Sequence, residues 1–252
     1  MPRVDEVNQR VSRDVRTIDR EVDGFVSTLV SLMQRKILRE LSLLPNRELR
    51  KREALRLLGG MESLILEDEE IFAHIESIQD IFDLQASMME DLYIFANDGE
   101  APPKSGKVPQ SALAVFVNSR RQNIEIMSRA YANEVRQRLA DSIISEEPIT
   151  DFDVTEAPVG RIIGALSNDL KTASSTYSRM IALEQGGRFV LYAGPRDGRN
   201  RPFCAERVNN IYPMEAVYTW DNGQGIPAHL YCGGWGCRHV LIPIRRPDGF
   251  KD

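Results

Sequence analysis

One apolar stripe at the start of the chain constrains the fold more than any other feature of the sequence. Apolar residues recur there at steps of three and four, at Val4, Val7, Val11, Val15, Ile18, Val22, Phe25, Leu29, Leu32, Met33, Ile37 and Leu41. An α-helix has about 3.6 residues per turn, so this spacing places them on one face. No proline interrupts the pattern before Pro45. The sequence therefore predicts one amphipathic helix over residues 4–43.

A helix of this length exceeds the usual helix of a globular domain, and its apolar face needs a partner that covers it. Two arrangements provide one. The helix either packs along several helices of the same chain, or it forms a coiled coil with another copy of the protein. The β-branched residues of the stripe fit both arrangements, so the sequence leaves both open.

Four further helices are expected before residue 186. They cover residues 46–58, 62–96, 111–144 and 159–185, and glycine pairs end the first and the last of them, at Gly59-Gly60 and Gly186-Gly187. The acidic run 67–70 is interpreted as a solvated face of the second of these helices. Proline-containing segments near 97–110 and 146–158 break the helical pattern and are interpreted as linkers. Residues 1–186 thus form a predicted helical region.

The character of the sequence changes after Gly187. The runs 188–194 and 240–244 are short, apolar and typical of strands, and Pro243 favours a strand at the edge of a sheet. Glycine-containing turn dipeptides are concentrated between these runs. We therefore predict a mainly-α fold in which long amphipathic helices form an elongated bundle, followed by a small loop-rich α+β unit at residues 187–252.

Composition excludes several classes of protein. No apolar run approaches the ~20 residues of a membrane span, and the first residues carry no apolar signal-peptide core. We expect a protein that is made in the cytoplasm and has no membrane partner. The net charge is −5 and no strongly basic block exists, which does not favour direct nucleic-acid binding. Three cysteines are an odd number and form no disulfide framework.

The potential metal ligands of the chain are concentrated in its C-terminal unit. Two of the three histidines and all three cysteines lie there, at Cys204, His229, Cys232, Cys237 and His239. Thiolates and imidazoles are the ligands that Zn²⁺ prefers, in a tetrahedron of four. A small unit with little apolar core gains folding free energy from such a site. If residues 237–239 enter a strand, Cys237 and His239 share one face. These residues predict one structural Zn²⁺ ion.

Three alternatives to the metal site stay open. The first is a Cys232–Cys237 disulfide without metal, which an environment outside the cell would favour. The second is a set of reduced, merely buried cysteines. The third is a catalytic cysteine with His229 or His239 as its base, although no orienting acid can be identified from the spacing.

Charged residues lie near the Cys/His residues, most of them in a loop that precedes His229 and one between Cys237 and His239. They are Asp197, Arg199, Arg201, Arg207 and Arg238. Arginines in such a loop can bind a phosphate or carboxylate partner. The interpretation we favour is structural: the arginines and Asp197 cross-brace a loop that has little regular backbone hydrogen bonding.

Several segments of the C-terminal unit together resemble the C-terminal signature of the phage head-morphogenesis proteins, also called Mu F-like minor head proteins. The segments are GPRDGRNRPFC (194–204), IYPMEAV (211–217), DNGQGIP (221–227) and CGGWGCRH (232–239), followed by VLIPI. The matching positions are Asp197, Arg201, Pro202, Cys204, Glu215, Gly233, Gly234, Cys237, Arg238 and His239. The resemblance covers about the last 65 residues.

The resemblance implies a structural protein of a tailed-phage virion, involved in head morphogenesis at the portal vertex, neck or head–tail junction. The partners it implies are other virion proteins such as portal, capsid, neck or tail components. It also leads us to expect a homo-oligomeric ring and localisation in the virion. The alternative is a metal-dependent hydrolase or transferase built on the Cys/His residues. The sequence lacks the H-E-x-x-H, G-x-S-x-G and P-loop patterns, so a non-enzymatic role is the expectation.

Overall fold

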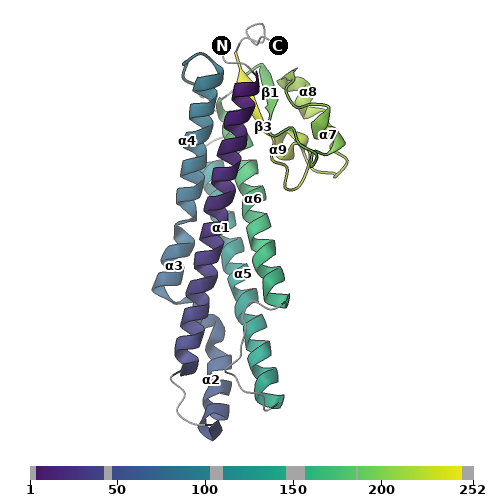
Figure 1. Ribbon diagram of the computed structural model, residues 1–252. Helices are drawn as coiled ribbons and strands as arrows, with labels where there is room; N and C mark the ends of the chain where they lie inside the picture. Colours follow the sequence, from purple (N-terminus) through teal and green to yellow (C-terminus); the bar gives the residue numbers. More distant parts are fainter. Residues whose placement is uncertain (1–3, 43–46, 103–109, 146–156, 186, 246–252) are drawn as a thin grey trace. The chain divides into compact units, whose positions relative to one another are not determined.

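Long helices make up most of the protein in the computed structural model, which describes residues 4–42, 47–102, 110–145, 157–185 and 187–245 (Figure 1). The helices before residue 186 are α1 (Val4–Ser42), α2 (Arg47–Leu66), α3 (Glu69–Glu76), α4 (Ile78–Ala96), α5 (Gln110–Ser145) and α6 (Ala157–Gln185). Residues 103–109 and 146–156, which make up most of the predicted linkers near 97–110 and 146–158, lie outside the described residues, so the linkers stay a prediction. The prediction of a mainly-α fold is confirmed.

The C-terminal residues form a small sheet with short helices. The strands are β1 (Phe189–Ala193), β2 (Ile211–Pro213) and β3 (Val240–Ile244), and the helices are α7 (Pro202–Ala205), α8 (Met214–Tyr218) and α9 (Ala228–Tyr231). The strand order is β2-β1-β3 with antiparallel pairing on both sides. Strand β3 is therefore an edge strand, as Pro243 predicts. The small α+β unit is confirmed as well.

Two predictions about helix ends are wrong. Helix α2 continues through Gly59 and Gly60 to Leu66. Each glycine costs a helix about 1 kcal/mol, but the turns that follow bury Met61 and Ile65, and this burial outweighs the cost. The acidic run at 67–70 is more than a solvated face, because Asp68 caps α3 by accepting hydrogen bonds from the N–H groups of Glu70 and Ile71. The helix expected over 62–96 is thus divided.

The described chain divides into two compact units. Unit 1 comprises residues 1–22, 79–118 and 170–252, and unit 2 comprises residues 23–78 and 119–169. Unit 1 contains the whole C-terminal sheet together with segments of the helical region. The boundary at residue 186, which the change in sequence character suggests, stays a prediction.

The stripe of α1 is covered within the chain. In unit 1, Val7, Val11 and Val22 are buried, and in unit 2, Leu29 and Ile37 are buried. These burials are those of a single chain. Of the two arrangements that the sequence leaves open, the structure shows packing against helices of the same chain.

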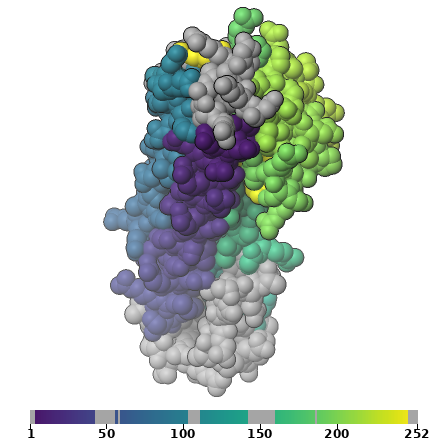
Figure 2. Space-filling model, turned by 45° about the horizontal axis from the view of Figure 1, so that its top comes forward, coloured from purple at the N-terminus to yellow at the C-terminus, as the bar shows by residue number. Residues whose placement is uncertain are grey.

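The sheet of unit 1 has two covered faces because side chains alternate along a strand. Leu191 and Ala193 of β1 face a core that α1, α4 and α6 share. Val190 and Tyr192 face the opposite core, which contains the three cysteines. The N-terminal part of α1 lies directly beside the C-terminal residues (Figure 2), where Asn8 Oδ1 accepts a hydrogen bond of 2.9 Å from the Gly194 N–H.

The helices of the described residues do not combine the length and apolar character that crossing a membrane requires.

Candidate metal centre

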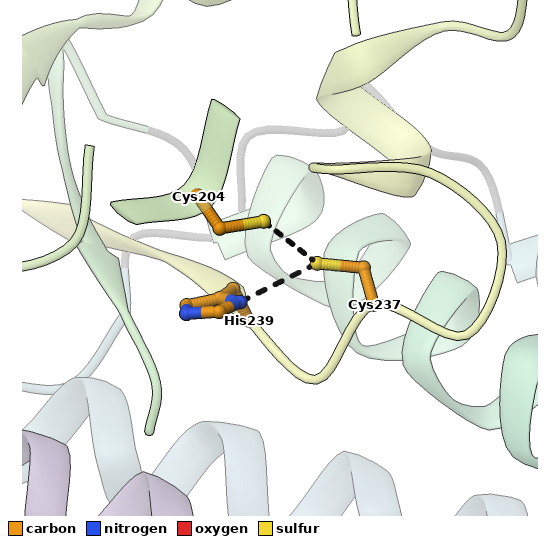
Figure 3. Close-up of side chains that lie close together, drawn as sticks. All are labelled: Cys204, Cys237 and His239. Atoms are coloured by element: carbon orange, nitrogen blue, oxygen red, sulfur yellow. Dashed lines mark hydrogen bonds between the residues drawn. The ribbon is translucent and has the colours of Figure 1, made fainter. Parts of the chain in front are cut away.

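Three side chains converge on the face of the sheet that carries the short helices α7, α8 and α9. Cys204 lies on α7, and Cys237 and His239 lie in the segment that enters β3 (Figure 3). The two sulfur atoms are 3.7 Å apart, and Cys237 Sγ is 3.4 Å from His239 Nδ1. All three ligand atoms lie within 4.8 Å of one another, and each residue is at most 6% exposed. This group could hold a metal ion.

The observed distances fit a tetrahedral zinc site. Zinc–sulfur bonds of about 2.3 Å and zinc–nitrogen bonds of about 2.0–2.1 Å place two sulfurs about 3.8 Å apart, and a sulfur and a nitrogen about 3.6 Å apart. The corresponding distances in the protein are 3.7 and 3.4 Å. The side chains are thus already spaced as two edges of such a tetrahedron.

Two glycines let the backbone approach the three donors. A Cβ at Gly233 would overlap the sulfur of Cys204, and it would also lie 3.5 Å from that of Cys237. A Cβ at Gly194 would lie 2.6 Å from Cδ2 of the His239 ring. These approaches explain why the segment around the donors contains glycine at these two positions. Gly233 is also one of the positions that carry the family resemblance.

The orientation of His239 suits a metal ligand. Its Nε2 lies 3.1 Å from the carbonyl oxygen of Pro195, and a carbonyl oxygen only accepts hydrogen bonds. A hydrogen on Nε2 satisfies this oxygen, and in the neutral ring that tautomer leaves the lone pair for a metal on Nδ1, the atom that faces Cys237. Metal-ligating histidines are commonly held in this way by a carbonyl group. The ring also stacks on Tyr192 at a centroid distance of 5.2 Å.

The protonation of the cysteines is unequal. The thiols of Cys204 and Cys232 donate toward Cys237 and lower its pKa, against the effect of burial. The pKa of Cys204 is raised by this interaction with Cys237 and by burial, and the pKa of Cys232 is raised by burial first. The Gly233 N–H donates to Cys237 Sγ over 3.4 Å. These hydrogen bonds favour the thiolate form of Cys237, the form in which cysteine binds a metal.

Cys232 lies at the border of the group. It is fully buried at the C-cap of α9, beside the thiol of Cys237 and the guanidinium of Arg179. Its sulfur is not among the atoms that lie within 4.8 Å of one another. All three cysteines of the chain are free thiols, so the alternative Cys232–Cys237 disulfide is not formed.

The structure does not bring His229 into the group. Its ring lies on α9 against Tyr218, with centroids 4.9 Å apart, and partial burial lowers its pKa. The single turn of α9 directs Ala228 into the core, and the neighbouring position of His229 consequently faces α8. Of the five residues expected to bind metal, three form the group, Cys232 borders it and His229 packs elsewhere.

The charged loop is bound to the same region. Arg238 donates to both carboxylate oxygens of Asp197 at 2.9 and 2.8 Å, and the Arg199 N–H donates to Asp197 Oδ1. These bonds, that from Arg238 first, lower the pKa of Asp197 to about 2. Arg201 donates to the carbonyl oxygens of Gly233 and Trp235, each at 2.7 Å.

Arg207 makes a separate set of contacts. It donates to the Phe203 carbonyl oxygen at 2.9 Å and lies over the rings of Phe203 and Trp220. The hydrogen bonds named here for Asp197, Arg199, Arg201, Arg207 and Arg238 join C-terminal residues to one another, which is the arrangement that cross-bracing requires. Arg238 also interacts electrostatically with Asp19 of α1.

Two further residues, Tyr192 and Arg179, contact the site, and the sequence did not lead us to expect either of them there. The Tyr192 hydroxyl donates to Cys204 Sγ over 3.3 Å, and Arg179 of α6 is 1% exposed. Arg179 donates to the carbonyl oxygens of Leu230, Cys237 and His239 at 2.8, 3.0 and 2.6 Å. Burial is the largest single effect and lowers the pKa of Arg179, but Cys232, Cys237 and Tyr192 each raise it, and the net direction is upward. The one feature of the sequence that could have indicated a buried role for Arg179 is its position as a cation in the largely apolar stretch from Tyr177 to Ile181.

No family model, curated protein or solved structure matches this chain.

Proposed function

We propose that this chain is a structural protein of a tailed-phage virion, a minor head component of the portal vertex or head–tail junction that takes part in head morphogenesis. We further propose that its Cys/His group holds one structural Zn²⁺ ion. The proposal of a virion role begins from the resemblance carried by segments 194–204 and 232–239. In this role the chain assembles into a homo-oligomeric ring with portal, capsid, neck or tail proteins.

One observation carries the proposal. Several of the residues that match the family signature contact one another in the structure and hold the C-terminal unit together. Cys204, Cys237 and His239 form the metal-binding group, and Arg201 donates to the carbonyl oxygens of the loop that contains Cys237. Arg238 pairs with Asp197. A chance match of scattered residues would not select contacting side chains, so this convergence supports a common structural unit.

The chemistry of the donors favours zinc, and their burial favours a structural role. Two thiolates and an imidazole are ligands of borderline softness, which suit Zn²⁺ better than Mg²⁺ or Ca²⁺. A catalytic zinc keeps an open position that a substrate reaches. Here each of the three donor residues is at most 6% exposed. This burial supports the structural alternative over the hydrolase or transferase.

Metal content tests the zinc proposal. We expect about one zinc per purified chain, as two thiolates and an imidazole in tetrahedral spacing require. Cys204→Ser, Cys237→Ser and His239→Asn should lose the metal, and His229→Asn serves as the matched control because His229 lies outside the group. A metal-free wild-type protein whose three thiols all react with a thiol reagent under native conditions would contradict the zinc proposal.

Particle composition tests the virion proposal. Particles of the phage or prophage that encodes this chain are purified on a density gradient, and their proteins are identified by mass spectrometry. The chain should be present in few copies, and disruption of its gene should lower the yield of infectious, DNA-filled heads. Complementation with wild type should restore the yield and Cys204→Ser should not, whereas His229→Asn should. Normal particles that lack the chain would refute the proposal.

A further inference from the structure

Arg179 is a buried cation that pairs with no carboxylate in the part of the chain that the structure describes. It is 1% exposed, and no ion pair to it occurs among the described residues. Its guanidinium donates to three carbonyl oxygens, of Leu230, Cys237 and His239. Carbonyl oxygens satisfy hydrogen-bond donors but carry no net charge. Because an uncompensated buried charge is strongly destabilising, this arginine calls for an anion nearby.

The groups that face Arg179 are thiols. Cys232, Cys237 and Tyr192 lie close to the guanidinium, and the Cys232 thiol contacts it directly. Arg179 also donates to the carbonyl oxygen of Cys237 at 3.0 Å. Both thiols are buried. Asp197, a carboxylate of this region, is paired with Arg238, and the other nearby arginine, Arg201, is exposed and needs no buried anion. The negative charge that Arg179 requires therefore has to come from the metal centre itself.

Charge counting distinguishes two ligand sets. Zn²⁺ with the thiolates of Cys204 and Cys237 and the neutral imidazole of His239 has a net charge of zero, which leaves Arg179 uncompensated. A third thiolate gives the centre a charge of −1, and Arg179 then makes the buried assembly neutral. The presence of the buried arginine thus favours the three-thiolate set.

We propose that Cys232 is the fourth ligand of the metal centre, and that Arg179 is a positioning residue that supplies its counter-charge and holds the ligand loop. This inference rests on the zinc centre of the proposed function and goes beyond it by fixing the ligand set as three cysteines and one histidine. It also assigns a role to a residue of α6 that lies 25 positions before the first ligand.

The backbone around Cys232 can deliver its sulfur to the centre. The next residue, Gly233, lies against the sulfurs of both Cys204 and Cys237. Cys232 itself has a positive φ of 46°, and Asn222 donates to its carbonyl oxygen at 3.1 Å. Arg179 bonds to the chain before Cys232, at Leu230, and after it, at Cys237 and His239. The guanidinium therefore fixes both ends of the segment that carries three of the four ligands.

A double-mutant cycle on metal binding tests the inference. The variants are Cys232→Ser, Arg179→Gln and the double substitution. Arg201→Gln is the matched control, because Arg201 also donates to carbonyl oxygens of this loop but is exposed. Zinc affinity is measured by competition with a chromogenic chelator. The number of thiolate ligands is measured from the sulfur-to-metal charge-transfer absorption of the Co²⁺-substituted protein.

Cys232→Ser should reduce the charge-transfer absorption by about one third, since one of three thiolates is lost. Arg179→Gln should lower zinc affinity by about 10- to 100-fold in the wild-type background. It should have much less effect in the Cys232→Ser background, where no negative charge needs compensation. Arg201→Gln should leave the charge-transfer absorption unchanged. Any loss of zinc affinity that it causes by loosening the loop should be of equal size in the wild-type and Cys232→Ser backgrounds, because Arg201 is exposed and compensates no buried charge.

Two results would overturn the inference while the zinc proposal stands: a Cys232→Ser protein that keeps the full charge-transfer absorption, or an Arg179→Gln effect of equal size in both backgrounds. If Arg179→Gln alone fails to fold, folding of the double variant supports the charge coupling, and failure of both variants contradicts it. A wild-type protein that binds neither Zn²⁺ nor Co²⁺ would instead refute the zinc centre itself.

Discussion

Replacement of Gly194 by alanine would show whether the metal centre depends on the close approach of the backbone to His239. A Cβ at this position would lie 2.6 Å from Cδ2, 2.9 Å from Cγ and 3.0 Å from Cα of His239. Rotation of the ring cannot relieve the contact with Cα, which belongs to the backbone that enters β3. We therefore expect the backbone at His239 to shift and the hydrogen bond from Nε2 to the Pro195 carbonyl oxygen to break.

The cost can be worked out from these contacts. Overpacking of a tightly packed site costs about 1–3 kcal/mol, and the lost hydrogen bond adds about 1 kcal/mol. The free energy of unfolding should thus fall by about 2–4 kcal/mol, which lowers the Tm of a chain of this size by roughly 4–16 °C. Zinc affinity should fall by about 10- to 100-fold, because the imidazole loses its orientation.

Thermal unfolding followed by circular dichroism measures the first effect, and chelator competition measures the second. Gly198→Ala is the matched control, since a Cβ at Gly198 has no atom within 4 Å and the residue lies in the same loop. If Gly194→Ala matches Gly198→Ala in both Tm and zinc affinity, the reasoning that ties the His239 position to Gly194 is wrong.

Three further predictions follow from other parts of the protein. Gly60→Ala in α2 should raise the free energy of unfolding by about 0.5–1 kcal/mol in urea titrations, because the site is helical and open; an unchanged midpoint would argue against a helix there. Asn97→Ala should lower the free energy of unfolding by about 1–3 kcal/mol, since the buried amide donates to the carbonyl oxygens of Tyr93 and Pro243 and accepts from the Arg245 N–H. Asn118→Ala is the control, because Asn118 is exposed. The pKa of Asp197 is lowered from 3.8 to about 2, so its pairing with Arg238 stabilises the fold above pH 3.8 and is lost as the pH falls through about 2; a carboxyl NMR titration with a midpoint near 3.8 would contradict the pairing.

The long helices could be predicted because their signal is local and repeated. The α1 stripe predicts a helix over 4–43, and the helix observed is Val4–Ser42. The end of α2 could not be predicted in this way. Local preference stops a helix at Gly59-Gly60, whereas the burial of Met61 and Ile65 in the following turns favours its continuation. That burial depends on contacts distant in sequence, which periodicity does not contain.

The sequence predicted the ligand types of the candidate site, cysteine and histidine, but not all of the residues that form it. The i, i+2 spacing of Cys237 and His239 correctly suggests a shared face at the entry to β3. His229 has a suitable spacing from Cys232, but one turn of α9 turns it toward Tyr218. Arg179 has no spacing signal at all, because its contacts with Leu230 and His239 bridge 51 and 60 residues. Only the folded chain brings α6 against the ligand loop.

The two faces of the sheet explain why a metal centre would be needed on one of them. Leu191 and Ala193 pack against α1, α4 and α6, so apolar burial against long helices stabilises that face. The opposite face is covered mainly by α7, α8 and α9, which have four, five and four residues, and Leu183 and Arg179 of α6 also reach it. Isolated helices shorter than about 12–15 residues are marginal in water, and these three depend on tertiary anchors. Cys204 on α7 and Cys232 at the end of α9 lie at two such anchors, and His239 fixes them to β3. A metal ion held there would therefore stabilise the covering layer and its loops, while the sheet itself keeps its support from the helices.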